Sequence, residues 1–543
     1  MEFQYKYFGQ SQVSHSADKS ALSFAPDTLR SPTYFSAQLN RHIPFREAMS
    51  ALHEIVVSDF RFQPRDKSDY KAWLASQDEI FMAQALQYQN KSKAHLEQLQ
   101  SELRDLNQTE YALMKPFYTA RAAYYNYLYS EDIDAWFVLD PVITVHPDSL
   151  FFECFSQDES SYGKLSCSYE VFQSIQAQAC GTTNIDYSHA LYQEFQKIRD
   201  YKPTQFVIDP SGFEVQTADG DAFKEEKIDL PDSWVRGFLQ VSSAMHLPMT
   251  RLDLHPMDVY NLLSYLRQHK EKSGPRSLRF ELEPGRPVVI VVEPWNLVLT
   301  CPRSVYTGPE ARHIRIWGRR RLFVLERLLP VCRNIQIHLL GTGMPSFWIA
   351  EMPEMSFTLG LSGWSANDFS RAGQFDLMAP RGQVDRQSAQ AIFACLQSSW
   401  FARAQDLAKL SGKDLNTVRA AMSLYAQSGR VLYDLQEDCY RIRELSREAL
   451  PVEDLRYANE REARAERFVQ AGLVELELRG DPTSACRLKG KVTDNAQEYP
   501  LELEIDSDLR LVNGSCKCHF YYQNHLRQGP CEHLLALRLA NGI

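Results

Sequence analysis

The amino-acid sequence predicts a multidomain protein of the α+β class. The chain has 543 residues, more than one hydrophobic core ordinarily serves. Stretches in which apolar residues recur every three or four positions are followed by short apolar runs that Pro and Gly interrupt, as expected for helices and for strands. Close to the C-terminus, cysteine and histidine residues occur at a spacing typical of a metal site.

The composition is that of a globular protein. Hydrophobic residues make up 44%, aromatic residues 12% and charged residues 24% of the chain, which argues against long disordered stretches. A formal net charge of −10 removes the simplest electrostatic argument for nucleic-acid binding without excluding it. The opening MEFQYKYFGQSQ lacks the features of a signal peptide, and no apolar run is long enough for a membrane span. Since most of the eleven cysteines are scattered, we expect a reducing, cytoplasmic location with no membrane contact.

The N-terminal region, residues 1–132, is predicted to be mainly helical. Helical periodicity is carried by Leu74, Phe81, Ala85, Tyr88, Leu96, Leu99, Leu103 and Leu106. A helix of the domain core is favoured over a coiled-coil partner face, because the pattern lasts for too few heptads. A second helix over 119–129 would complete a helical hairpin within 70–129.

Residues 133–380 are predicted to form a mixed α+β domain. Strand-like apolar runs occupy 278–301, 314–330, 334–341, 346–352 and 355–364, and a helix is expected over 257–272. The Gly-Thr-Gly stretch at 341–343 lacks the lysine of a phosphate-binding loop and the third glycine of a dinucleotide-binding fingerprint, so it is interpreted as a turn between strands.

Two charged stretches in this domain each allow a functional and a structural interpretation. Acidic side chains and a histidine occur together at His146, Asp148, Glu153, Asp158 and Glu159. They could perform acid/base chemistry or bind a metal, but their spacing matches no template and a solvated loop is favoured. The arginines of GRRR at 318–321 could meet phosphate or an acidic partner, or could form a solvated edge.

Residues 385–445 resemble a winged helix. Helices are expected over 387–398, 401–410 and 414–427, followed by a β-hairpin of VLYDL and CYRIREL. The third helix would present Asn416, Thr417 and Arg419 near its N-terminus, where DNA-reading residues usually lie, and Arg430 is a further candidate. However, Asp414 at the helix start would repel phosphate, and winged helices also bind proteins.

The C-terminal segment combines a charged helical linker, 446–472, with a predicted metal-binding domain, 473–543. Four short strand candidates precede Cys516 and Cys518, which on a strand would project to the same face. We place Cys531 in the turn before a helix and His533 in its first turn, where both can meet the ion that the other cysteines hold. Three thiolates and an imidazole fill the four positions around one Zn²⁺, which predicts structural rather than catalytic zinc.

The pattern C-x-C-x12-C-x-H, with strands before it and a helix after it, resembles the SWIM-type zinc finger family and its ββα layout. The resemblance implies that Cys516, Cys518, Cys531 and His533 are the zinc ligands. The stretches 31–39, 153–163, 314–330 and 356–370 further resemble large bacterial SWIM-containing proteins found beside MoxR-type AAA+ ATPases and von Willebrand factor A domain proteins. This wider resemblance implies an accessory role in an ATPase-driven assembly; the chain itself has no Walker A sequence.

Three hypotheses of function follow from the sequence. The first is a non-enzymatic adaptor that acts through protein–protein interaction, with the MoxR-type ATPase and the von Willebrand A protein as partners. The second is a DNA-binding protein that uses the winged helix and the finger together. The third is an enzyme with an unrecognised site in 133–380. Residues 484–543 carry seven basic and seven acidic residues, and this formal neutrality favours a protein partner over nucleic acid.

Overall fold

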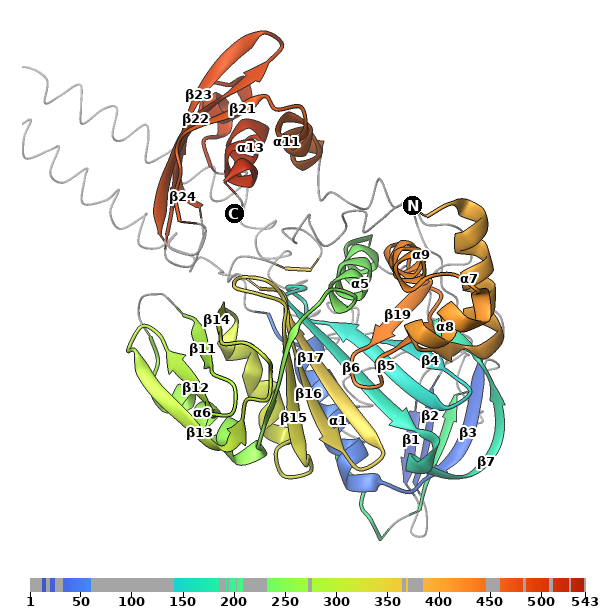
Figure 1. Cartoon of the computed structure of the whole chain (residues 1–543). Coiled ribbons are helices and arrows are strands. Elements are labelled where there is room, and N and C mark those ends of the chain that lie inside the picture. The colour runs from blue at the N-terminus through green and yellow to red at the C-terminus, as the bar shows by residue number, and fades with distance from the viewer. Residues whose placement is uncertain are drawn as a thin grey trace, which may run out of the picture. The chain divides into compact units, whose positions relative to one another are not determined.

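The protein divides into two compact units, one formed by Met1–Asp59 with Leu139–Ile543 and the other by Phe60–Val138. The computed structural model describes residues 12–15, 20–24, 33–59, 141–184, 192, 195–201, 203–208, 232–271, 276–363, 368–369, 384–445, 460–481, 485–506, 511–526 and 529–541 (Figure 1). The predicted helical hairpin over 70–129 lies outside these residues. Within them the fold is a mixed α+β arrangement with several sheets, as predicted. None of the described helices combines the length and the apolar character needed to cross a membrane.

An eight-stranded sheet is the largest element of the described chain (Figure 1). Its strands, in spatial order, are β10 (Thr250–Leu254), β15 (Asn334–Leu339), β16 (Ser346–Met352), β17 (Met355–Leu361), β6 (Ser161–Ser168), β5 (Ser149–Phe155), β4 (Val142–Val145) and β8 (Gly181–Asn184). The pairing of β17 with β6 joins two segments that are far apart in sequence. Strands β4, β5 and β17 are buried along their whole length, which explains their nearly continuous apolar sequences.

Two smaller sheets accompany it. The five-stranded sheet consists of β1 (Gln12–His15), β2 (Ser20–Phe24), β9 (Thr204–Ile208), β3 (Tyr34–Leu39) and β7 (Phe172–Ala179). The four-stranded sheet consists of β13 (Leu297–Val305), β12 (Pro287–Val292), β11 (Leu278–Leu282) and β14 (Arg312–Ile316). The helices of this region are α1 (His42–Val56), α5 (Asp232–Met245) and α6 (Pro256–Gln268), with 3₁₀ turns η2 (Tyr169–Val171) and η3 (Arg319–Arg327). The predicted helix over 257–272 is confirmed by α6, and 341–343 is the turn between β15 and β16.

The N-terminal region differs from the mainly helical expectation in its described part. Strands β1, β2 and β3 precede the single helix α1, and β3 pairs with both β9 and β7. The alternation of Phe35, Ala37 and Leu39, all fully buried, is the sequence signal for this strand. Residues 33–56 therefore share sheets and core with residues that follow position 141, rather than forming a separate helical region.

Two predictions about charged stretches are wrong. The stretch 314–330 is not a strand throughout: after β14 the chain turns at Gly318, whose φ is 81°, into η3. Arg319 and Arg321 are buried there because their guanidinium groups bond main-chain carbonyl oxygens of Ser277 and Ser160. These two arginines cannot form a solvated edge, whereas Arg320 between them is half-exposed and pairs with Glu271.

The acidic stretch beginning at His146 is not a solvated loop either. His146 and Glu153 are fully buried, and Asp158 and Glu159 are 8% and 6% exposed. Their burial is possible because each finds partners: Asp158 accepts hydrogen bonds from the hydroxyl groups of Ser156 and Ser160, at 2.6 and 2.7 Å. Glu153 has one partner nearby in sequence, Tyr162, and one from a distant part of the chain, Arg443.

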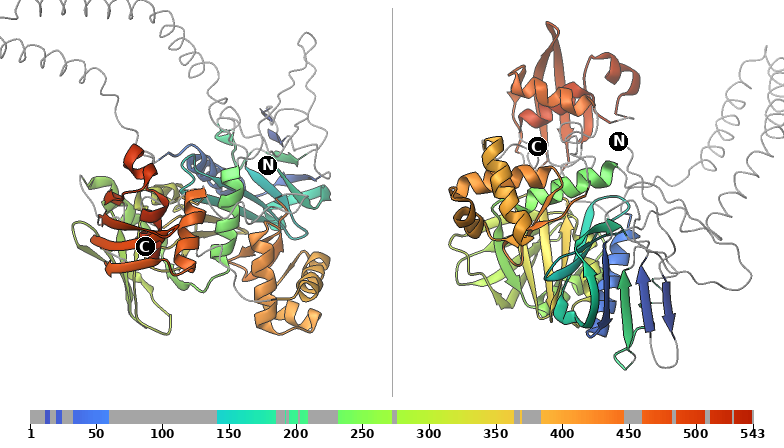
Figure 2. Two further views of the ribbon diagram at one scale, coloured as in Figure 1. Left: turned by 90° about the horizontal axis from the view of Figure 1, so that it is seen from above. Right: turned by 90° about the vertical axis from the view of Figure 1, so that its right-hand side faces the viewer.

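Residues 384–445, the helical unit, contain the three helices and the hairpin that the sequence predicts. Its elements are α7 (Arg386–Ser399), β18 (Phe401–Ala402), α8 (Ala404–Ser411), α9 (Leu415–Gln427), β19 (Val431–Asp434) and β20 (Cys439–Ile442). Asp385 and Asp414 cap α7 and α9, each accepting a main-chain N–H hydrogen bond with its side chain. The three helices contact one another around an apolar core that includes Ile392, Leu396 and Val418 (Figure 2).

A fully buried ion pair holds the helical unit against the eight-stranded sheet. Arg443 Nη1 donates to Glu153 Oε1 at 2.8 Å, and neither side chain is exposed to solvent. The same carboxylate oxygen accepts from the Tyr162 hydroxyl at 2.7 Å, while Arg443 Nη2 donates to Ser242 Oγ at 2.7 Å. Two charges that are removed from water together must stay paired, because either one alone would bear its full desolvation cost.

A second charged cluster lies beside this pair. Asp434 accepts hydrogen bonds from Lys164 Nζ at 3.2 Å and from Arg441 Nε at 3.1 Å, and Arg441 also donates to Asp148 at 2.9 Å. His146 Nε2 lies 2.6 Å from the Ile442 carbonyl oxygen, to which it donates as the neutral imidazole. The interface between the unit and the sheet is therefore closed by specific polar contacts rather than by apolar packing alone.

We expect Arg443→Met to lower the free energy of unfolding by about 3–5 kcal/mol, because Glu153 is then left buried without its counter-charge. Adding Glu153→Gln should restore much of this loss, since the amide carries no charge. Arg430→Met, which removes a half-exposed pair with Glu444, is the matched control and should cost less than about 1 kcal/mol. Urea denaturation measures all three; equal costs for Arg443→Met and Arg430→Met would contradict the buried pair.

Acidification should weaken the same interface. Burial lowers the pKa of His146 to about 4 and that of His246, which lies against Tyr433 and Tyr440, to about 3. In the unfolded chain both pKa values return to about 6.5, so the stabilisation is complete above pH 6.5 and is lost as the pH falls toward 4. Replacing His246 by Phe should flatten the pH dependence of unfolding over this window, whereas replacing the exposed His313 by Gln should leave it unchanged.

Candidate metal centre

The C-terminal module, residues 460–541, is built from a four-stranded sheet and three helices. Its elements are α11 (Glu460–Gln470), β21 (Val474–Leu478), β22 (Cys486–Asp494), β23 (Gln497–Ile505), β24 (Leu511–Ser515), α12 (His519–Asn524) and α13 (Glu532–Ala540). The strands lie in sequence order, and α11 and α13 cover one face of the sheet (Figure 1). All four predicted strands and the last helix are confirmed.

The hairpin between β22 and β23 turns through only two residues. Asp494 pairs with Gln497, and the intervening Asn495 and Ala496 have φ values of 49° and 63°. Positive φ at both positions is the signature of a type I′ turn, whose twist matches that of antiparallel strands.

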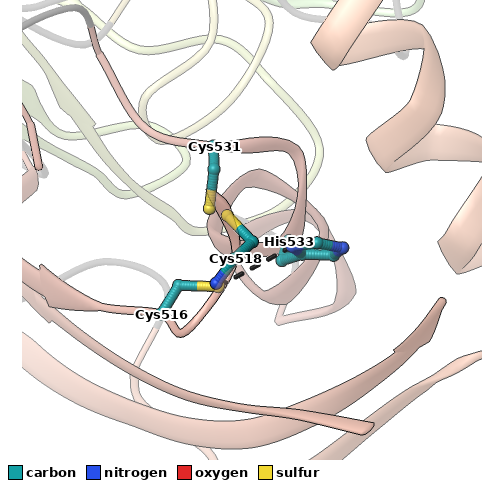
Figure 3. A group of neighbouring side chains, drawn as sticks. All are labelled: Cys516, Cys518, Cys531 and His533. Atoms are coloured by element: carbon teal, nitrogen blue, oxygen red, sulfur yellow. Dashed lines mark hydrogen bonds between the residues drawn. The ribbon is translucent and has the colours of Figure 1, made fainter. Parts of the chain in front are cut away.

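The four predicted ligands converge on one point at the end of this sheet. Cys516, Cys518, Cys531 and His533 are all buried, and their ligand atoms lie within 4.8 Å of one another. Figure 3 shows the three sulfur atoms and the imidazole pointing toward a common centre, with the contact of Cys516 and His533 marked. The structure thus brings together the same four residues that the sequence predicts, although fifteen positions separate Cys516 from Cys531.

The local positions of the ligands agree in part with the sequence argument. As expected, Cys531 is the N-cap of α13 and His533 lies in the first turn of that helix. Cys516 and Cys518, however, do not lie on a strand: β24 ends at Ser515, and Cys518 caps the short helix α12. Cys516 Sγ accepts from the Cys518 N–H and Cys518 Sγ accepts from the Tyr521 N–H, both at 3.4 Å. The chain folds around the sulfur atoms here, and a strand could not supply these donors.

The residues present fit a tetrahedral metal ion. Cys516 Sγ and His533 Nδ1 are 3.7 Å apart, and ordinary Zn–S and Zn–N bond lengths at a tetrahedral angle require about 3.6 Å. Hydrogen bonding to Cys516 and burial together raise the pKa of Cys531 to about 12, so a cation is needed to displace its proton near neutral pH. The donor set is therefore suited to a divalent metal ion that binds sulfur and nitrogen. Without such an ion, the Cys531 thiol keeps its proton near neutral pH.

The orientation of His533 depends on neighbours that the sequence motif does not include. Its ring lies between Tyr499, at a centroid distance of 4.4 Å, and Phe468, at 5.5 Å, and is nearly parallel to both. Its Nε2 lies 3.3 Å from Asp494 Oδ2. A proton on Nε2 that is donated to this carboxylate leaves Nδ1 free to bind metal, the arrangement by which carboxylates commonly orient ligand histidines.

In the sequence, Lys517 and Arg527 are the basic residues near enough to the cysteines to moderate the charge of the thiolates, but nothing in the motif points to Asp494 and its partner Arg464. Arg464 bonds Asp494 and Glu532, both at 3.0 Å. Lys517 is exposed, and Arg527 lies outside the described residues. The two other histidines near the cysteines in sequence lie at the periphery: His519 is exposed and bonds Gln523, and His525 is exposed and lies against Tyr521. The position of Asp494 at the end of a predicted strand is the one sequence signal that could have indicated a carboxylate near the ligands.

The candidate nucleic-acid-binding residues are not gathered into a basic surface. Asn416 and Arg419 are exposed on the first turns of α9, but Thr417 Oγ1 donates to Asp414 at 2.5 Å. The guanidinium of Arg430 is occupied by Glu444 at 3.0 Å and lies over the Phe393 ring, 4.6 Å from its centroid.

Helix α9 itself is enclosed beyond its first turns. Its buried residues are Val418, Ala420, Ala421, Met422, Ser423, Ala426 and Gln427, which surround the helix axis on nearly all sides. The helix contacts α5 as well as α7, α8 and β19. A helix that reads DNA must present an open polar face to the major groove, whereas beyond its N-terminal turns α9 exposes mainly the apolar side chain of Leu424.

We expect Asp494→Asn to weaken zinc binding about 10- to 100-fold, because the amide no longer fixes the His533 ring by a charged hydrogen bond. Competition with a chromogenic chelator measures the affinity. Glu498→Gln, on the neighbouring strand β23, removes an exposed carboxylate that pairs with Lys491 and serves as the control. An unchanged affinity in Asp494→Asn would show that the carboxylate does not orient the ligand.

Comparisons with known proteins add little to this picture. No protein-family model matches the chain, and no curated protein matches it. The solved structures to which it is similar include proliferating cellular nuclear antigen from Entamoeba histolytica, with 10% identity and a TM-score of 0.28 over 41% of this chain and 88% of that one. Another is described as the C-terminal region of FEN-1 bound to A. fulgidus PCNA, with 10% identity and a TM-score of 0.29 over 42% and 91%. At these TM-scores the likeness carries no argument about fold or function.

Proposed function

We propose that this chain is a zinc-binding SWIM-domain protein that acts as a non-enzymatic adaptor through protein–protein interaction. In this proposal residues 473–543 are the SWIM-type finger and 385–445 the winged-helix-like domain, with 446–472 between them. The observation that carries the proposal is the buried cluster of three cysteines and one histidine. Four protein donors complete a tetrahedral shell, so the ion has no position left for substrate or water and serves to hold the module together.

The charges of the module support a protein partner rather than nucleic acid. The basic residues of β22 are paired with carboxylates on the neighbouring strands. Arg487 pairs with Glu504 at 3.2 Å, and Lys491 with Glu475 at 3.1 Å, while Lys489 pairs with Glu502. Cations that are already neutralised displace no counterions from a phosphate backbone, which removes the main source of nonspecific DNA affinity.

A DNA-binding role remains the alternative that a specific feature favours, namely the exposure of Asn416 and Arg419 on α9. An enzyme in 133–380 has less support. Asp434, a buried carboxylate outside this range that is bonded by Lys164 within it, is unsuited to such a site: although burial alone would raise the pKa of Asp434, Lys164 and Arg441 lower it to about 2. A general acid or base works best with a pKa near the operating pH, and Asp434 is far from that condition.

Zinc should be bound at about one ion per chain, because one tetrahedral shell is present. We expect Cys516→Ser combined with Cys518→Ser to abolish zinc binding and to unfold the module, since metal binding and folding are coupled in units of this size. Cys486→Ser changes a nearby cysteine that is not a ligand and should retain full zinc content. Metal analysis of the purified full chain measures the stoichiometry; zinc retained in the double variant would contradict the assignment.

The adaptor role predicts that the zinc-loaded chain co-purifies with a AAA+ ATPase of the MoxR type and its von Willebrand A partner from its native host. The Cys516→Ser, Cys518→Ser variant should lose this association and Cys486→Ser should keep it. The chain should not retard duplex DNA in a gel at about 0.15 M salt. Retardation that falls steeply with salt and is lost in Arg419→Ala would instead establish the DNA-binding alternative.

A further inference from the structure

A cleft lies where the helical unit meets the eight-stranded sheet. Its volume is about 760 Å³, and it is lined on one side by residues of β5, β6, β16 and β17 and on the other by α8, β18 and the β19–β20 hairpin. Of these elements, Figure 1 labels β5, β6, β16 and β17 on the sheet side and α8 and β19 on the other. The buried contacts of Arg441 and Arg443 fix the two walls against each other, so the cleft is a built feature of the fold.

The lining combines apolar surface with an excess of negative charge. Its apolar side chains are Met352, Met355, Phe401, Ala402 and Leu410. Five carboxylates face two guanidinium groups, the carboxylates being Asp148, Glu354, Asp406, Asp434 and Glu437 and the cations Arg403 and Arg441. Lys164 and Arg41, which pair with Asp434 and Glu354 from outside the lining, reduce this excess of three negative charges to one, and the remaining negative charge is complementary to a cation.

The charges differ in how far they are already neutralised. Asp434 and Asp148 share Arg441, and Glu354 is bonded by Arg41 at 2.6 Å. By contrast, Glu437 is exposed and its carboxylate makes no hydrogen bond or ion pair within the described residues, where Asp406 has only the distant Lys409, at 3.9 Å. Two carboxylates at the cleft are thus available to a ligand.

Two further features point to an extended polypeptide as the occupant. Phe401 and Leu410 both line the cleft and remain 36% and 64% exposed, so they offer apolar surface that a bound segment can cover. Strand β18 is the edge of its three-stranded sheet, so its outer main-chain groups are open to a further strand. The hydroxyl of Ser356, a residue only 5% exposed, also lines the cleft and makes no hydrogen bond within the described part of the chain.

We propose that this cleft binds an extended segment of the partner protein in which a lysine or arginine is flanked by apolar residues. The basic side chain would reach Glu437 and Asp406, and the apolar neighbours would cover Phe401 and Leu410. This inference rests on the proposed adaptor function and adds to it the chemistry of the recognised segment. It assigns recognition of this segment to the helical unit and the sheet, in addition to the contribution of the zinc module to the association.

The test begins by selecting random short peptides displayed on phage against the immobilised full-length, zinc-loaded chain. The selected peptides should carry Lys or Arg beside Leu, Met or Phe, and fluorescence anisotropy should show binding that weakens with salt. In Asp406→Lys with Glu437→Lys the Kd should rise at least about tenfold, since attraction becomes repulsion. Leu410→Ser should also weaken binding. The side chains of Asp406, Glu437 and Leu410 are exposed, so the variants should fold, and an unchanged urea denaturation transition checks this.

The matched control reverses two exposed carboxylates away from the cleft, Glu283→Lys with Glu310→Lys, which adds the same charge. It should change the Kd by less than about twofold. Equal weakening by both double variants, selected peptides without basic residues, failure to select any peptide, or competition by duplex DNA would each overturn the proposal. Co-purification of the ATPase that requires Cys516 and Cys518 but survives Asp406→Lys with Glu437→Lys would refute the cleft while leaving the adaptor function intact.

Discussion

The buried ion pair of Glu153 and Arg443 is the contact on which the arrangement of the described chain depends. It joins the middle of strand β5 to the segment just after β20, 290 residues later in sequence. Because neither charge can be left alone inside the protein, the helical unit is fixed against the sheet. The enclosure of α9, the burial of His146 and the cleft beside α8 depend on this pair together with the neighbouring charged cluster around Arg441.

The metal centre depends on a different and more local constraint. Its ligands, the hairpin that carries Asp494 and the helix that carries Arg464 all lie within residues 460–541. This locality explains why the sequence alone predicted that these four residues come together: a short spacing of cysteines and histidine restricts the geometry, and the strand and helix patterns around it are equally short-range. The role of Asp494 could not be predicted, because it depends on how the hairpin packs against α13. The spacing of residues along the sequence does not determine that packing.

The remaining predictions succeeded where the signal was local in sequence and failed where the structure depends on distant partners. The elements of the helical unit followed from helical periodicity, capping residues and a hairpin pattern, and all are present. The burial of Arg319, Arg321 and Glu153 contradicts the expected solvated positions, because charged residues are ordinarily exposed and only distant partners reverse that tendency. Strand β3 was overlooked since six alternating residues are a weak signal until β9 and β7 are known to lie on either side.

The two-residue turn at Asn495 and Ala496 has a consequence for the metal centre. Side chains alternate between the faces of a strand, so the length of this turn decides which face Asp494 occupies. A single inserted residue that shifted the register of β22 against β23 would move the carboxylate to the side away from His533. Insertions that most surface loops tolerate would therefore be selected against here, and relatives of this protein should keep the turn at constant length even where its residues vary.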